Sequence, residues 1–384
     1  MTSPTGALSR LLGGTGTASF ADTYWGVRPH RSVIDDVSDL FSAAAVDELI
    51  SVRGLRTPFL RIAKDGRTYA DRDFTSGGGV GAAIGDQLND DRIWRLFESG
   101  ATLVLQGLHR TYEPVLRFTQ DLAADLGHPC QVNAYVTPPQ STGFDDHYDV
   151  HDVFVVQVEG EKRWRIREPV WPVPLRDQPW DEHKDSVAAA AAEEPLEEFV
   201  MTPGDVLYLP RGYLHSATAL GDISIHLTIG VHQWTRHHLA EQLVAEALTA
   251  LGRNETIRGS LPLGLDVGEP APLADDLSAV RQALLDALTQ VPDSDVSSAM
   301  AARARAAQRS GPLPPLAQLR AARGGIDRVE LRAHLDPRLR TDPPRLLTRL
   351  GSVPLRPEDQ AEVEKLIESR GPLVVSTGGR HGIG

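Results

Sequence analysis

The sequence contains very little cysteine and no long apolar stretch. Cys130 is the single cysteine among 384 residues, which excludes an intramolecular disulfide and a zinc module built from several cysteines. No run approaches the roughly 18 consecutive apolar residues that a membrane-spanning helix needs. The first ten residues lack the charged segment and apolar core of a leader peptide. We therefore expect a cytoplasmic protein without membrane contact.

Basic residues are also scarce relative to acidic ones. Lys and Arg together number 39 and Asp and Glu 52, so the formal net charge is −13. This balance argues against nucleic acid as a partner, because binding to a phosphate backbone depends on a positive surface. An acidic surface would instead attract a basic protein or peptide.

Length and pattern indicate two or three domains. Apolar residues at three-to-four spacing predict helices over 91–100 and 113–127, with a short strand over 101–106 between them. From residue 131 to 231 the pattern changes to short apolar runs punctuated by Gly and Pro, which is typical of a double-sheet barrel or jelly roll. The strands predicted there cover 132–136, 153–158, 163–167, 206–209 and 223–231.

The rest of the chain is predicted to be mostly helical or irregular. A segment rich in Pro, Trp, Asp and Ala interrupts the strand region and is expected to be a surface excursion. It covers 169–198, and it is followed after 235 by a helix ending at Gly252, a Pro/Gly-rich linker over 259–272, a helix over 277–291, and a mixed tail from about 320 with a β-like run at 373–375.

The segment from Gly143 to Gln157 carries several potential metal ligands, in the order His147-Tyr-Asp149-Val-His151. Side chains at i and i+2 of a strand point the same way, so all three would share one face of an extended segment. A strand rises about 3.3 Å per residue, which separates His147 from His151 by about 13 Å, too far for one metal. Either His147 with Asp149 or Asp149 with His151 can serve, and spacing does not decide between them.

A further donor lies in a second segment. Residues 203–215 read as a turn, a strand, a second turn and then His215, which places this histidine at the end of a later strand. Two histidines and one carboxylate form the ligand set of oxygen-activating Fe(II) sites, and the same set also accepts Mn, Co, Ni or Zn. His226, a polar position in the apolar run 223–229, would either face the same cavity or be a hydrogen-bonded core residue.

Four blocks of the strand region together resemble the JmjC-type Fe(II)- and 2-oxoglutarate-dependent oxygenases, most closely the ribosomal oxygenases among them. The blocks are 133–139, 143–157, 159–165, and 203–215 continuing to 224–228. The string 20–29 also looks like the entry segment of this family, with weaker specificity. Because both the order and the spacing of the blocks fit, the resemblance covers the whole of 131–231.

The resemblance implies roles for individual residues. His147, Asp149 and His215 would be the iron ligands, which leaves His151 as a neighbour. Lys162 would hold the distal carboxylate of 2-oxoglutarate, since an anion deep in a barrel requires a cation. Asn133 and Tyr135, which share a parity on a strand, would line the cosubstrate pocket.

The family's architecture and activity follow as expectations. The fold would be mainly β with α: a double-stranded β-helix (jelly-roll, JmjC/cupin) catalytic domain over 1–234, a helical dimerisation region over 235–319 and a winged-helix-like domain over 320–384. With Fe(II), and with 2-oxoglutarate and O2 as cosubstrates, it would hydroxylate a protein side chain and release succinate. The relatives imply Arg or His of a ribosomal protein as the target, and a homodimer as the assembly.

Three other interpretations stay open. The protein could be a 2-oxoglutarate oxygenase acting on a small molecule, a natural-product peptide or a methylated lysine. It could be a non-oxygenase metal cupin, such as an isomerase or a sugar-binding module, although Lys162 would then have no obvious use. It could also be a regulator that binds nucleic acid through its tail, with candidate arginines at Arg338, Arg340, Arg345 and Arg349.

Overall fold

The computed structural model of the protein describes residues 6–142, 144–324, 328–369 and 373–374. Gly143 of the predicted ligand segment lies outside the described residues, and so do Val375 and other parts of the predicted C-terminal domain. The chain divides into two compact units, Met1–Gln233 and Trp234–Gly384, which are considered separately. This division lies next to the start of the predicted helical region, whereas the boundary at 320 stays a prediction. Within the described ranges, no helix has the length and apolar character to cross a membrane.

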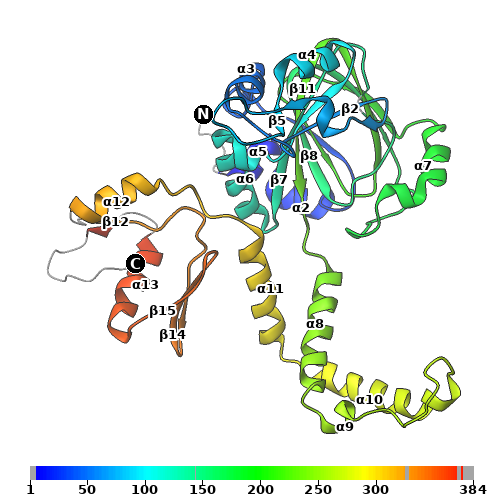
Figure 1. Cartoon of the computed structure of the whole chain (residues 1–384), viewed down its shortest axis with the longest axis vertical. Helices are drawn as coiled ribbons and strands as arrows, with labels where there is room; N and C mark the ends of the chain where they lie inside the picture. The colour runs from blue at the N-terminus through cyan, green and yellow to red at the C-terminus, as the bar shows by residue number, and fades with distance from the viewer. Residues whose placement is uncertain (1–5, 143, 325–327, 370–372, 375–384) are drawn as a thin grey trace. The chain divides into compact units, whose positions relative to one another are not determined.

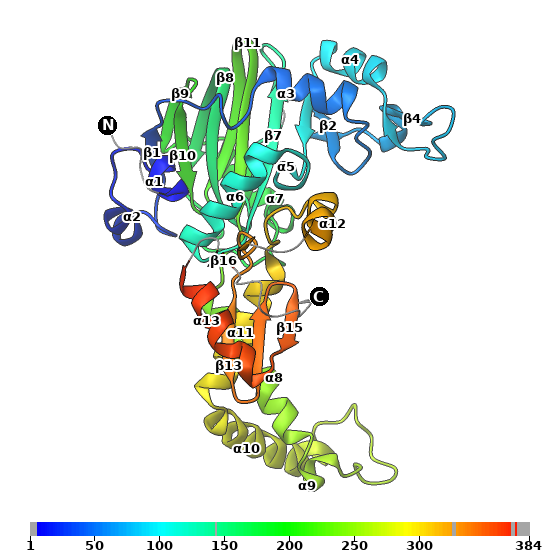
Figure 2. The ribbon, with the colours of Figure 1, turned by 90° about the vertical axis from the view of Figure 1, so that its left-hand side faces the viewer.

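The first unit is built on an antiparallel sheet with the strand order β1-β10-β8-β11-β7-β6-β2-β3 (Figure 2). A further strand, β9, pairs with β8 beside this path. The strands span His30–Val33 (β1), Leu60–Lys64 (β2), Arg67–Thr68 (β3), Thr102–Leu105 (β6), Cys130–Thr137 (β7), Asp152–Arg167 (β8), Glu197–Met201 (β9), Asp205–Leu209 (β10) and Leu214–Val231 (β11).

Two long strands connect the layers of this sheet. β8 merges the predicted strands 153–158 and 163–167, and β11 extends the predicted strand 223–231 back to Leu214. They pair with each other over nearly their whole length. The N-terminal half of β8 pairs with β10 and the C-terminal half of β11 pairs with β7, while the C-terminal half of β8 pairs with β9 on one side and with the N-terminal half of β11 on the other. Two facing layers result, and the predicted double-stranded β-helix of jelly-roll type is confirmed.

Gly160 lies where this ladder changes register. Glu161 pairs with Leu220 and Glu159 with Ile225, so the segment 221–224 of β11 stands opposite Gly160 alone. The glycine has a φ of 62° and packs so closely that an added Cβ would lie 2.1 Å from the Ile223 carbonyl oxygen. Only a residue without a side chain fits this crossing.

The Gly160→Ala substitution is therefore expected to lower the free energy of unfolding by more than the roughly 1–2 kcal/mol of a left-handed backbone alone, because the clash adds to it. Gly221→Ala is the matched control: its φ is 64° and nothing lies within 4 Å of an added Cβ. Urea unfolding of both variants measures the difference. Equal losses would show that the close approach at Gly160 has no energetic weight.

Alternation along the strands divides the apolar side chains between two clusters. On β8, Phe154 and Val156 join the large cluster under the helices. Val153 and Val155 point the other way and join a cluster inside the barrel with Trp164, Ile166, Met201, Leu207, Leu209 and Tyr213. The inner cluster forms part of the wall around the candidate site described below.

Helices of the first unit cover the outer face of the sheet, where Figure 1 and Figure 2 show α5 and α6 beside β7. The predicted helix 113–127 is confirmed as α6, Glu113–Leu126, with Pro114 in its first turn and Gly127 ending it at a φ of 69°. The predicted helix 91–100 is α4, and the predicted strand 101–106 is β6. The short elements are α1 (Ala7–Leu11), α2 (Thr17–Thr23), α3 (Ala43–Asp47), a π-helix (Glu48–Val52), a 3-10 turn (Asp71–Asp73), α4 (Asp90–Glu98), α5 (Leu108–Thr111) and the hairpin β4 (Thr75–Ser76) with β5 (Gln87–Leu88).

The insertion 169–198 is more ordered and more engaged than expected. It contains a 3-10 turn at Trp180–His183 and the helix α7, Lys184–Ala191, and its end begins strand β9. Val187 of α7 is buried and packs with Tyr148 and Leu214. The prediction of a plain surface excursion is therefore wrong for the inner face of this helix.

The second unit is helical at first and then mixed. Its first helices pack around Ala247, Leu251 and Ala287, and a three-stranded antiparallel sheet follows. The elements are α8 (Arg236–Leu251), α9 (Glu255–Arg258), a 3-10 turn (Ala271–Leu273), α10 (Ala274–Gln290), α11 (Asp293–Ala307), α12 (Pro315–Gly324), β12 (Arg328–Val329), β13 (Arg338–Thr341), β14 (Pro344–Thr348), β15 (Gly351–Pro354), a 3-10 turn (Pro357–Asp359), α13 (Gln360–Ser369) and β16 (Leu373–Val374).

Three of the four candidate arginines of the tail have partners within the second unit. Arg349 donates to the carbonyls of His334 and Ala304. Arg345 donates to Ser352, and Arg338 forms an ion pair with Asp336. This engagement weakens the interpretation of these side chains as a nucleic-acid surface.

Candidate metal and cosubstrate site

A pocket opens between the two layers of the barrel, with an empty volume of about 520 Å³ that includes space open to solvent. Five of the six residues predicted for the site line it, and Asn133 does not. The lining residues are Thr102, Tyr135, Phe144, His147, Asp149, Val153, Val155, Lys162, Trp164, His215, Ser216, Ala217, His226 and Thr228.

His147 and His215 meet through their backbones. The amide of His147 donates to the carbonyl of His215 at 3.2 Å, and the amide of His215 donates back at 2.8 Å. The two ring centroids are 4.4 Å apart. This single antiparallel bridge brings the first predicted ligand segment against the start of β11, so His215 lies at the beginning of a strand and not at the end of one.

The segment that carries His147 and Asp149 is a loop. Regular pairing of β8 begins only at Asp152, so the prediction that the two side chains open a strand is wrong. Asp149 is held by its carbonyl, which accepts from the Gly212 amide at 3.0 Å. Its Oδ2 lies 3.8 Å from Nε2 of His215. Backbone contacts with the opposite segment therefore place His147 and Asp149 near His215, whereas strand parity was expected to do so.

Both imidazoles present the same nitrogen to the pocket. Nδ1 of His147 lies 2.7 Å from the carbonyl of Asp145, and Nδ1 of His215 lies 3.1 Å from the carbonyl of Tyr213. A carbonyl only accepts, so each Nδ1 carries a proton, and in the neutral form of each ring the lone pair is on Nε2. This is the arrangement that outer partners impose on metal-binding histidines.

Charge favours the forms that bind cations. Burial, followed by the nearby His147, lowers the pKa of His215 to about 4, so its ring is neutral at pH 7. Burial alone would raise the pKa of Asp149, but His151, His215, His147 and Arg61 hold it below its usual value. A neutral imidazole of His215 and the carboxylate of Asp149 therefore face one space, which the His147 ring also lines.

The donors fit a divalent transition metal by kind, charge and proximity. Across the described ranges, however, no three His, Cys, Asp or Glu side chains already converge as a closed cluster. The ligand set His147, Asp149 and His215 accordingly stays a prediction, supported by the backbone bridge between His147 and His215.

Lys162 lies on the opposite part of the same pocket. Its side chain points inward from β8 and the residue is 3% exposed. Its Nζ donates to Oγ1 of Thr137 at 3.1 Å and lies 3.5 Å from Nδ1 of His226. Burial lowers its pKa to about 7. Within the described parts of the chain, this buried amine has no ion pair with a carboxylate.

Tyr135 and His226 stack beside the lysine. Their rings are 4.9 Å apart and nearly parallel, at 4°. Burial, and then Lys162 and His215, lower the pKa of His226 well below its ordinary value, which leaves a neutral ring facing the amine. His226 therefore belongs to the pocket, the first of the two alternatives that the sequence left open.

Two predicted neighbours have other surroundings. Asn133 shares the parity of Tyr135, but its Oδ1 accepts from the Gly107 amide at 3.0 Å. His151 is not among the lining residues: its Nε2 lies 3.4 Å from Gln131, and its ring is 5.0 Å from that of His232. These contacts favour the pair His147 and Asp149 over Asp149 and His151.

Three residues that contact side chains of the pocket had no role there in the sequence-based prediction. Thr137, two positions after Tyr135, accepts from Lys162, and strand parity alone could have indicated it. Trp164 lies between the histidines, with ring centroids 6.1 Å from His215 and 5.5 Å from His226. Arg61 lies 5.0 Å from the Phe144 ring, and it comes from a distant strand for which the sequence offered no signal.

Fold and pocket together define the class: a double-stranded β-helix whose interior carries two histidines, a carboxylate and a buried lysine. Residues 109–239 match the family described as the JmjC domain. This stretch of the chain is thus similar to JmjC domains, and relatives of the chain are named ribosomal oxygenases and histidyl-hydroxylases.

Two curated relatives illustrate the similarity. The bifunctional lysine-specific demethylase and histidyl-hydroxylase NO66 of Drosophila willistoni is 36% identical over 178 residues, which is 44% of this chain and 22% of the relative. Ribosomal oxygenase 1 of Homo sapiens is 35% identical over 144 residues, which is 36% of this chain and 22% of the relative. The matched region thus spans about a fifth of these longer proteins.

Solved structures show the same fold. The Escherichia coli ribosomal oxygenase YcfD in complex with cobalt and 2-oxoglutarate matches with a TM-score of 0.53 at 18% identity, covering 92% of this chain and 89% of that chain. Its complex with cobalt and succinic acid matches with a TM-score of 0.53 at 19% identity, covering 89% and 86%. At this identity the likeness establishes the fold.

Proposed function

We propose that this protein is an Fe(II)- and 2-oxoglutarate-dependent oxygenase that hydroxylates a protein side chain. In this reaction 2-oxoglutarate, O2 and a C–H bond yield succinate, CO2 and a C–OH group, with one oxygen atom entering succinate and the other the hydroxyl. The names of the relatives and the 2-oxoglutarate bound in YcfD support the proposal.

The observation that carries the proposal is the buried amine of Lys162. A cation withdrawn from water is costly unless an anion accompanies it. Among the described residues, the polar partners of the Lys162 amine are a hydroxyl and a neutral imidazole, and Lys162 shares its pocket with the candidate metal donors. A ligand with a metal-binding end and a carboxylate at the other end satisfies both parts, and 2-oxoglutarate has this form.

The three metal donors would be His147, Asp149 and His215. Fe(II) bound there supplies the activation of O2 that couples decarboxylation of 2-oxoglutarate to C–H oxidation. The carbonyls of Asp145 and Tyr213 accept from Nδ1 of the two rings, so Nε2 is the nitrogen that each neutral ring offers to a metal.

Aromatic side chains shape the chamber between the metal donors and Lys162. Trp164 is 4% exposed and contacts both His215 and His226, and Tyr135 stacks on His226 from the other strand. These rings line the pocket between the histidines and the lysine with apolar surface. Within such a low-dielectric space the pairing of Lys162 with a carboxylate is stronger than in water.

As the substrate we propose an arginine or histidine of a ribosomal protein. Ribosomal proteins are basic, and a chain with a net charge of −13 would attract them electrostatically. The names ribosomal oxygenase and histidyl-hydroxylase among the relatives point the same way. The cytoplasm, where ribosomes assemble, would be its location, and the single cysteine agrees with a reducing compartment.

The proposal is tested by incubating the purified protein with Fe(II), 2-oxoglutarate and a total ribosomal-protein fraction. We expect succinate to form and one ribosomal protein to gain a single oxygen atom in mass spectrometry. Formation of succinate without any modified ribosomal protein would contradict the proposed substrate but not the proposed oxygenase activity. No succinate under any iron-loaded condition would contradict the oxygenase itself.

The pKa of Lys162 predicts a pH dependence of cosubstrate binding. Its value of about 7 in the folded protein means that the amine loses its proton above pH 7, whereas pairing with a carboxylate requires the charged form. We expect KM for 2-oxoglutarate to rise with pH above about 7, approaching roughly tenfold per unit. Succinate formation between pH 6.5 and 9 measures it.

Lys162→Arg is the control for this pH dependence, because a guanidinium stays charged throughout the range. Its KM is expected to be higher than that of the wild type at pH 7 but to stay level as the pH rises. A wild-type KM that does not change across the range would contradict a titrating lysine in the cosubstrate site.

The helices of the second unit are proposed to form a homodimer interface. Several of their apolar residues are exposed in the single chain, which is unusual for a helical pair that only packs on itself. They include Leu239, Val244, Leu248, Leu277, Val280 and Leu285. Light scattering on the purified protein would give twice the 41.7 kDa chain mass if the proposal holds, and a monomer mass would contradict it.

A further inference from the structure

The loop that carries two of the proposed metal ligands has few backbone contacts of its own. Between the end of β7 and the start of β8, its backbone is tied to the opposite segment at Ser141 and Thr142, at the His147–His215 bridge and at the Asp149 carbonyl. None of these backbone contacts is made by Asp146 or Tyr148, the residues that flank His147. Side chains must therefore contribute to the order of this loop.

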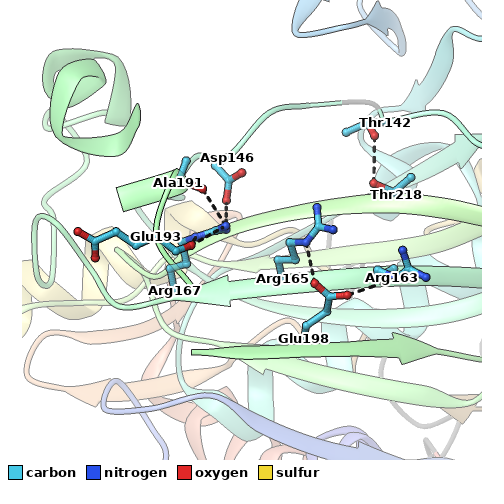
Figure 3. A network of polar contacts seen from close by, with 9 residues as sticks. All are labelled: Thr142, Asp146, Arg163, Arg165, Arg167, Ala191, Glu193, Glu198 and Thr218. Atoms are coloured by element: carbon cyan, nitrogen blue, oxygen red, sulfur yellow. Dashed lines mark hydrogen bonds and ion pairs between the residues drawn. The ribbon is translucent and has the colours of Figure 1, made fainter. Parts of the chain in front are cut away.

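Arg167, at the end of β8, binds the loop on one side of His147. Its side chain is 9% exposed, and its Nη1 forms an ion pair with Oδ1 of Asp146 at 2.5 Å. The same guanidinium donates from Nη2 to the carbonyl of Ala191 at 2.9 Å and, more loosely, to the carbonyl of Glu193 at 3.4 Å. Figure 3 shows these contacts converging on Arg167. One side chain thus joins the ligand loop to the C-terminal end of α7.

Tyr148, which belongs to the loop itself, anchors it on the other side of His147. It is 1% exposed and packs with Val187 of α7 and Leu214. Its hydroxyl donates to the carbonyl of Gln178 at 3.1 Å, inside the insertion 169–198. Burial of an aromatic side chain between His147 and Asp149 restricts the rotation of the backbone that carries both donors.

We propose that Arg167 is a positioning residue that fastens the insertion 169–198 to the ligand loop and thereby sets the orientation of His147 and Asp149 toward His215. This rests on the proposed metal site. Arg167 does not line the pocket, so it acts through Asp146 and α7. A planar guanidinium suits this role because it donates to a carboxylate and to carbonyls simultaneously.

Arg165 provides the matched control. It lies two residues earlier on the same face of β8 and donates to Oε2 of Glu198 at 2.8 Å (Figure 3). Both partners are 43% exposed, and neither contacts the ligand loop. Exposed pairs of this kind contribute little, so Arg165→Met removes an arginine and an ion pair of the same strand without loosening the loop.

The experiment titrates Co(II), as a spectroscopic substitute for Fe(II), into wild type, Arg167→Met, Arg167→Lys and Arg165→Met. Loss of an outer partner of a metal ligand typically weakens metal binding roughly 10- to 100-fold. We expect that loss for Arg167→Met, together with a changed visible absorption spectrum at saturating Co(II). Arg167→Lys keeps the pair with Asp146 but not all the carbonyl contacts, and is expected to be intermediate. Arg165→Met should match wild type.

Hydrogen exchange in metal-free protein tests whether Arg167 orders the ligand loop, without relying on the proposed function. Amides in 144–151 are expected to exchange faster in Arg167→Met and in Asp146→Asn than in Arg165→Met. Wild-type affinity and an unchanged spectrum in folded Arg167→Met, or unchanged exchange in both loop variants, would overturn the inference. If wild type itself binds no Co(II), the proposed function fails. The exchange comparison alone then decides whether Arg167 orders the ligand loop. Circular dichroism identifies any variant that does not fold, in which case Asp146→Asn is used.

Discussion

Replacing His147 with alanine is expected to abolish metal binding and 2-oxoglutarate turnover together. Removing an outer partner already costs roughly 10- to 100-fold in metal affinity or activity, so loss of a ligand should reduce succinate formation by more than about 100-fold. The backbone bridge to His215 does not depend on the side chain, and the fold is therefore expected to survive. Isothermal titration with Co(II) and a coupled succinate assay measure the two losses.

His151→Ala is the control for this experiment. The substitution removes a histidine from the same loop. The His151 side chain contacts Gln131 and His232 and does not line the pocket. We expect it to keep metal binding and turnover within a few-fold of wild type. Should His151→Ala abolish metal binding while His147→Ala does not, the ligand pair would be Asp149 and His151, the alternative that strand spacing leaves open.

The second large effect is expected at Lys162. Hydrogen bonds to charged groups contribute about 1.5–3 kcal/mol, and the charged partner here is buried. We therefore expect KM for 2-oxoglutarate to rise roughly 100-fold in Lys162→Ala. Co(II) affinity without cosubstrate should stay near the wild-type value, because Lys162 lies on the other part of the pocket. Equal loss of both would indicate a general collapse of the site.

The same residue links function to stability. Burial holds the pKa of Lys162 at about 7, below its value of about 10.4 in an unfolded chain. The unfolded state therefore binds more protons between these values, and stability rises with pH across that window. Lys162→Met removes the buried amine, so this variant is expected to unfold at a higher temperature than wild type at pH 7 without ligand. A lower melting temperature would contradict the idea that the amine is retained for binding.

The local sequence pattern was sufficient to predict elements whose ends depend on neighbouring residues alone. α6 ends at Gly127 because that residue adopts the left-handed conformation that glycine favours. β7 and β10 lie within two residues of their predicted ends, since alternation and turn residues mark them directly. Residue types and spacing indicated His215 and Asp149 but left His147 and His151 as alternatives, and the roles of His147 and Lys162 came from the resemblance to the family.

Other features were decided by contacts between distant segments. The pairing of β8 with β11 joins runs that look like separate strands, because Gly160 lets the ladder continue past the segment 221–224. Lys162 stands among charged residues and resembles a surface side chain, yet the parity that points Trp164 inward also buries it.

The ligand loop shows the division most clearly. Its sequence supplies His147 and Asp149, but their approach to His215 comes from a backbone bridge, from Arg167 and from Tyr148 packed under α7. None of these contacts is periodic, and all join segments far apart along the chain. The sequence by itself thus determined the chemistry that this protein has available, and only the tertiary structure decided which side chains meet, because meeting depends on long-range pairing and packing that no local pattern records.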